Sequence, residues 1–200
     1  MNNESKIMSE SKYAVPNENI TQWIQILKAR EEKGILLTRC EVLYLKLSET
    51  SFFTDPASAV WHCNYPGGLL EHSDNVRICL KKLTRDLKLK WKNYESPEII
   101  GMAHDVCKIG QYLPDGNGGY TKNPDHPKGH GDRSVEIVKQ WIELTDEEEY
   151  CIRWHMGAYD VKENWQLYND AIHRFPNVLW THTADMMATH IYEIPGGKSS

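Results

Sequence analysis

Residues 66–83 read PGGLLEHSDNVRICLKKL, and this stretch decides the fold class. Its apolar residues Leu69, Val76 and Leu80 recur at the spacing of one helical face, which predicts an amphipathic α-helix after the glycines. His72 falls on the same inward face. A histidine among the core positions of a helix is the first indication of a buried site.

Helical patterns continue on both sides of this stretch. Ser96 and Pro97 are typical of a helix start, as N-cap and first helical residue, and Gly110 is typical of a helix end. The alternation of apolar and polar residues that marks a strand is not found in the sequence. We therefore expect an all-α bundle. Its expected helices span about 18–30, 34–47, 68–89, 96–110, 130–144, 145–156 and 177–194.

One long segment interrupts these helices. Residues 111–129 contain four glycines and three prolines, a composition typical of a loop that covers a site. Its Asp115–Gly119 portion lacks the preceding strand and following helix of a phosphate-binding loop. We expect a flexible lid here.

The length of 200 residues suits one domain with one sizeable core. The expected organisation is a flexible leader over residues 1–15, a single helical domain over 16–195 and a loose tail over 196–200. Within the domain, residues 16–60 would form N-terminal helices and residues 61–194 the core that carries the site.

The net charge and the composition of the chain disfavour some classes of binding partner. A net charge of −5 and a pI near 6.0 disfavour stable binding to a nucleic-acid backbone. No membrane span or signal-peptide core is recognisable, so we expect a cytoplasmic protein that does not bind membranes. Five cysteines without Cys-x-x-Cys spacing predict reduced thiols. The sequence leaves open whether the chain forms a homo-oligomer.

The most informative pattern is an ordered set of histidines and aspartates, each position on a different expected helix. The set comprises His72, the adjacent pair His104-Asp105, His130, His155 and Asp185. Imidazole nitrogens and carboxylate oxygens suit Fe, Mn, Co or Zn, and six such groups exceed the needs of one ion. The pattern predicts two metal ions bridged by Asp105. His72, His104 and Asp185 would hold one ion, and His130 and His155 the other.

In this order, H…HD…H…H…D, the chain resembles the HD-domain superfamily of metal-dependent phosphohydrolases over about residues 61–194. The segment around His72 is most similar to the HD module of certain bacterial 3′–5′ exoribonucleases, whose oligonucleotide-binding domain is not recognisable here. The resemblance implies a helical bundle with a dinuclear site between helices, and a metal-bridging hydroxide that attacks phosphorus. It also implies that Lys108, which follows the His104-Asp105 pair, donates to the phosphate.

Further residues are candidates for supporting roles. His126 and Arg133 are expected to meet a leaving group or substrate phosphate, His62 to line the pocket and His182 to orient a ligand. His173 and His190 are expected to be surface or capped core histidines. Trp61 and Trp154 each precede a histidine, and either base stacking or ordinary packing accounts for them.

Three functions remain open at this point. The first is a phosphohydrolase or phosphodiesterase that acts on a nucleotide or small phosphate ester, with two divalent ions, iron or manganese first and cobalt, nickel, zinc or magnesium next. The second is an HD-fold mixed-valent di-iron oxygenase, because the ligand set does not separate it from the first. The third is a metal-stabilised nucleotide-binding module without turnover.

Overall fold

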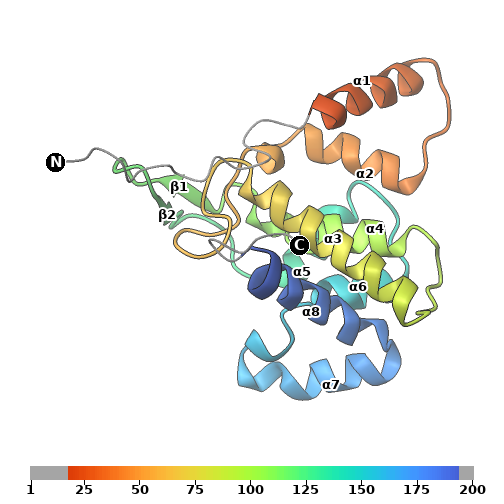
Figure 1. Ribbon diagram of the computed structural model, residues 1–200, viewed down its shortest axis with the longest axis vertical. Coiled ribbons are helices and arrows are strands. Elements are labelled where there is room, and N and C mark those ends of the chain that lie inside the picture. Colours follow the sequence, from red (N-terminus) through yellow and green to blue (C-terminus); the bar gives the residue numbers. More distant parts are fainter. Residues whose placement is uncertain (1–17, 194–200) are drawn as a thin grey trace.

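The computed structural model describes residues 18–193, which form a helical bundle with one small hairpin (Figure 1). The α-helices are α1 (Glu18–Glu32), α2 (Arg39–Ser48), α3 (Gly68–Asp86), α4 (Ser96–Ala103), α5 (His130–Val138), α6 (Asp146–Arg153), α7 (Trp165–Arg174) and α8 (Asn177–Met187). The strands are β1 (Tyr112–Pro114) and β2 (Tyr120–Lys122). The expected all-α class is confirmed. The leader over 1–15, the tail over 196–200 and the expected helix end at Ile194 lie outside the described residues.

Helix α3 is the centre of the bundle, with α4 and α8 packed along it (Figure 1). Its inward face is fully buried at Leu69, Val76 and Leu80, as the sequence pattern predicts. Helices α3 and α4 approach closely at Gly101, where an added Cβ would lie 2.4 Å from Cα of Arg77. His72 lies on this buried face and therefore points between the helices.

The N-terminal helices α1 and α2 form a layer at one end of the bundle, and α7 lies at the other end (Figure 1). Helix α2 begins later than expected, because Thr38 and Glu41 form a capping box that fixes its start at Arg39. Among residues 18–193, no helix is both long and apolar enough to cross a bilayer.

The expected helix over 96–110 is shorter in the structure. Helix α4 ends at Ala103, Asp105 adopts φ −109° and ψ 16°, and a short 3₁₀ turn over Val106–Lys108 follows. The role expected of Ser96 is also wrong, because Glu95 is the N-cap and the Ser96 hydroxyl donates to Glu148 Oε1. His104 is the C-cap of α4 and keeps helical dihedrals, so the chain leaves the helix at Asp105.

Four more segments differ from expectation. The glycine-rich segment forms the β1–β2 hairpin, with Leu113 opposite Thr121, and α7 has no counterpart among the expected helices. His155 lies two residues beyond the end of α6. Helix α8 continues as a π-helical turn over Ala188–Tyr192, which brings Glu193 back towards α3.

A partly buried ion pair joins three helices. The fully buried Glu148 carboxylate accepts two hydrogen bonds from Arg39, at 2.7 and 3.0 Å, and one from the Ser96 hydroxyl at 2.8 Å. The backbone N–H of Thr145 also donates to it, at 2.8 Å. Burial alone would raise the pKa of Glu148, but the bonds from Arg39, Thr145 and Ser96 outweigh burial and lower it.

Replacing Glu148 by alanine is therefore expected to lower the free energy of unfolding by roughly 3 kcal/mol, because Arg39, Ser96 and Thr145 lose a shared buried acceptor. The pKa of Glu148 is lower in the folded protein than in the unfolded chain, where it is about 4.3. The carboxylate therefore stabilises the fold above that pH, and this stabilisation is lost as pH falls below it. Urea titrations at pH 7 and pH 3 measure both effects. Glu149→Ala, which removes a surface pair with Lys139, should cost about 0–1 kcal/mol. Equal losses for the two variants would contradict this.

Candidate metal centre

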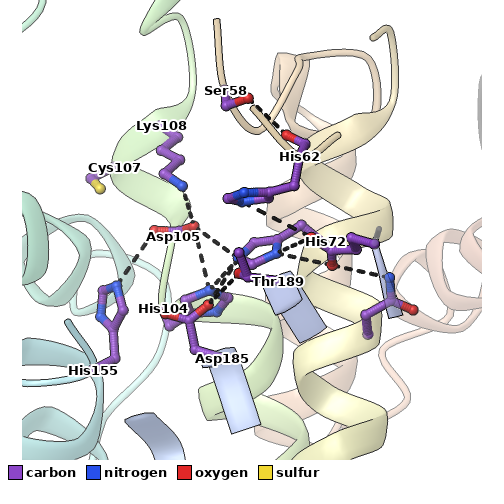
Figure 2. A network of polar contacts seen from close by, with 12 residues as sticks. Ser58, His62, His72, His104, Asp105, Cys107, Lys108, His155, Asp185 and Thr189 are labelled. Atoms are coloured by element: carbon purple, nitrogen blue, oxygen red, sulfur yellow. Dashed lines mark hydrogen bonds and ion pairs between the residues drawn. The ribbon is translucent and has the colours of Figure 1, made fainter. Parts of the chain in front are cut away.

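The structure brings the six predicted ligand residues into one cluster between helices, and Figure 2 shows all of them except His130. His72 comes from α3 and Asp185 from α8, His104 and Asp105 follow α4, His130 begins α5, and His155 follows α6. Apart from His130 they are buried, with Asp105 at the centre. A buried His/Asp cluster that could hold metal ions therefore lies between the helices.

The two oxygens of Asp105 face different partners. Oδ2 lies 3.3 Å from His72 Nε2 and 3.4 Å from His104 Nε2, and His72 Nε2 is 3.4 Å from Asp185 Oδ1. Oδ1 lies 3.0 Å from His130 Nε2 and 3.5 Å from His155 Nε2. The imidazole nitrogens thus lie on either side of one carboxylate.

The close approach of these nitrogen and oxygen atoms is better explained by binding to a shared metal ion than by hydrogen bonds between the side chains. Nε2 atoms of His72 and His104 are 3.2 Å apart, and those of His130 and His155 are 3.1 Å apart. Asp105 Oδ1 is buried and, although His130 Nε2 lies 3.0 Å away, it accepts no hydrogen bond of suitable geometry from the described residues, which is costly for a carboxylate oxygen. Converging imidazole nitrogens and an unpartnered carboxylate oxygen are the chemistry that a divalent cation satisfies.

Each histidine of the cluster is anchored by its outer nitrogen. Nδ1–H of His104 donates to the Gly101 carbonyl at 2.9 Å, and Nδ1–H of His155 to the Ile152 carbonyl at 2.6 Å. His130 Nδ1 lies 3.1 Å from the Cys107 thiol. A carbonyl acceptor requires the proton on Nδ1, so Nε2 carries a free lone pair that points inward.

Glu193 anchors the fourth histidine, and sequence reasoning missed it. Its carboxylate oxygens both lie 3.1 Å from His72 Nδ1, and Asn75 Nδ2 donates to Oε1 at 3.1 Å. Burial alone would raise the pKa of Glu193, but His72 outweighs it and lowers the pKa. No sequence signal marks Glu193, because only the π-helical turn after α8 directs it towards α3.

The charges of the cluster are coupled through Asp105 and Lys108. Burial alone would raise the pKa of Asp105, but the Lys108 ammonium and the surrounding histidines hold it well below its usual range. Lys108 Nζ lies 2.7 Å from Asp105 Oδ2, and this partner outweighs burial and raises the pKa of Lys108. At neutral pH the structure therefore favours a carboxylate and an ammonium at this point.

A cavity of about 630 Å³ opens onto the cluster. His62, His72, Asp105, Lys108, His155 and Asp185 are among its lining residues, which agrees with the expected place of His62. Trp61 is 81% exposed and lines this cavity, whereas Trp154 packs against the core. His190 also lines the cavity and is exposed, so a core role does not apply to it.

Other predicted residues lie elsewhere. His126 and Arg133 are not among the residues that line the 630 Å³ cavity but line a separate, smaller cleft. His182 Nδ1–H donates to the His155 carbonyl at 2.8 Å, so it contacts the backbone of that residue and not its ring. His173 is exposed, as expected.

Comparison with known proteins identifies no relative of this chain. A scan against protein-family models and searches of curated proteins and of solved structures find no match to this chain.

Proposed function

We propose that this protein is a metal-dependent phosphohydrolase or phosphodiesterase of the HD-domain type, acting on a nucleotide or another small phosphate ester. The observation that carries the proposal is the position of Asp105. One of its oxygens faces His72 and His104 and the other faces His130 and His155, while Lys108 contacts the same carboxylate from the cavity wall. Ion-binding donors and a cation for an anionic substrate thus meet at one place.

The proposed ligands follow the division of the cluster. His72, His104 and Asp185 would hold one divalent ion, His130 and His155 the other, and Asp105 both. Iron and manganese suit these donors, as do cobalt, nickel and zinc, and magnesium to a lesser degree. When bound, such a pair lowers the pKa of a shared water and neutralises charge on phosphoryl oxygens.

The side chains of the chain itself contribute binding and orientation. Lys108 lines the cavity and would donate to a phosphoryl oxygen. The Nδ1–H bonds of His104 and His155 keep their rings in place and so preorganise the site. A volume of about 630 Å³ lies within the range of pockets for small molecules and cofactors, about 300–1,000 Å³. A nucleotide is a ligand of this size class.

The test is an anaerobic screen with manganese or ferrous iron, using nucleotides, cyclic dinucleotides and small phosphodiesters. Release of phosphate or nucleoside without oxygen is the expected result. If no phosphorylated compound releases product with any divalent metal, the proposed hydrolase activity is refuted. Turnover that requires oxygen would identify the di-iron oxygenase, and ligand-dependent stabilisation without turnover would identify a binding module.

Glu193→Ala is expected to weaken metal binding by about 10–100-fold, because His72 loses the carboxylate that orients its ring. Glu193→Gln should recover part of the affinity, since the amide oxygen accepts the same bond. Manganese titration of the metal-free protein measures the change. Glu163→Ala, at an exposed position of a 3₁₀ turn, is the control. Equal affinities for wild type and Glu193→Ala would show that Glu193 does not position His72.

A further inference from the structure

A second cleft, of about 200 Å³, lies at the start of α5. Its lining includes Lys122 from β2, Lys128 from the following loop and Arg133 from the first turn of α5. His126 and His130 also line it, and no carboxylate does within the described part of the chain. Cationic side chains from one stretch of the chain, residues 122–133, therefore line one small space.

Two kinds of hydrogen-bond donor in this cleft lack an acceptor. Arg133 Nε is buried without a hydrogen-bond partner among residues 18–193. Helix α5, nine residues long, has Gly129 at its N-cap with φ 101° and no side-chain cap. The first N–H groups of a helix have no partner within the helix and carry partial positive charge. An anion in the cleft would accept hydrogen bonds from both Arg133 Nε and these backbone N–H groups.

The acidic side chain nearest to this helix start does not act as an acceptor for these donors. Asp132 lies in the first turn of α5, but its carboxylate accepts from Arg153 Nε at 2.5 Å and its side chain is 68% exposed. Asp132 therefore faces the ion pair with α6, and the cleft keeps its positive charge.

We propose that this basic cleft binds a phosphate-sized oxyanion. A space of about 200 Å³ is below the size of pockets for whole nucleotides, about 300 Å³ and above, but it holds one phosphate group. Uncapped helix starts and arginine are the groups that bind such anions.

The cleft adjoins the candidate metal centre through one side chain. The His130 side chain is 29% exposed and lines the cleft, while its Nε2 lies 3.0 Å from Asp105 Oδ1. An anion in the cleft is thus separated from the cluster by one imidazole ring. It is either free phosphate or a second phosphoryl group of the substrate, and only the latter rests on the proposed function.

Phosphate binding to the metal-free protein tests the cleft without turnover. The Lys108→Met background removes the main cation of the larger cavity, and ³¹P NMR or calorimetry follows inorganic phosphate. We expect binding in this background, weakened at least about 10-fold by Arg133→Met and by a smaller factor by Lys122→Met, because each removes a charge-assisted donor.

Controls locate the binding. Lys82→Met, at an exposed position of α3 that lines neither cavity, should leave phosphate affinity unchanged. Lys122 is exposed, so its variant serves if Arg133→Met fails to fold. Absence of phosphate binding, or affinity that is insensitive to Arg133→Met and Lys122→Met, would overturn the proposal.

Kinetics separate the two sources of the anion. If a second phosphoryl group of the substrate occupies the cleft, Lys122→Met raises KM for substrates with two phosphoryl groups and not for those with one. If free phosphate occupies it, KM is unchanged for both, and inhibition by added phosphate weakens in Lys122→Met. Phosphate binding without any hydrolysis would support the cleft and refute the proposed function, so the two fail separately.

Discussion

The Asp105→Asn protein is expected to bind neither metal ion at stoichiometric level and to lose activity by more than about 100-fold, the upper effect of removing a supporting residue. Asp105 faces both donor sets, with Oδ1 and Oδ2 each 3.0–3.5 Å from two Nε2 atoms. An amide presents one weaker oxygen donor and an NH₂ group that repels a cation. Metal analysis of the purified protein, with circular dichroism to check folding, measures the result.

Two variants make this test specific. Asp185→Asn should release only the ion on the side of His72, because Asp185 contacts that histidine. Asp86→Asn changes an exposed aspartate of α3 and should leave metal content unchanged. Full metal content in Asp105→Asn would refute the bridging role.

The Lys108→Met protein is expected to retain its metal ions and to hydrolyse phosphate esters about 100-fold more slowly, the effect of removing one donor to developing charge. Lys108 lines the cavity and contacts Asp105 Oδ2 at 2.7 Å, but an ammonium does not bind a metal ion. Turnover should therefore fall without loss of metal. Single-turnover kinetics beside metal analysis separate the two effects.

Conservative and distant changes complete this experiment. Lys108→Arg should recover part of the rate, since guanidinium also donates to phosphate. Lys139→Met removes a surface lysine paired with Glu149 and should leave the rate unchanged. Unaltered kinetics in Lys108→Met would remove this lysine from the site.

The bundle and the members of its buried cluster are predictable because they depend on local patterns. The spacing of Leu69, Val76 and Leu80 predicts which face of α3 is buried, and His72 lies on that face. The capping box at Thr145 and Glu148 predicts the start of α6. His72 and Asp185 lie on the packed helices α3 and α8, whereas His104, Asp105 and His155 follow helix ends, so local patterns predict which residues gather but not how they are placed.

The parts that the sequence does not predict depend on contacts between distant segments. Glu148 binds Arg39 and Ser96, which places Ser96 inside α4 and not at its cap. The π-helical turn after α8 brings Glu193 to His72, and no local pattern announces such a turn. The β1–β2 hairpin has strands of three residues each, too short to show an alternating pattern.

The most direct test of the account is a manganese titration of the metal-free wild-type protein, followed by electron paramagnetic resonance. We expect two ions per chain with a spin-coupled signal, since a shared carboxylate holds ions about 3.5–4 Å apart. A single uncoupled ion, or no binding at micromolar manganese, would contradict a centre bridged by Asp105.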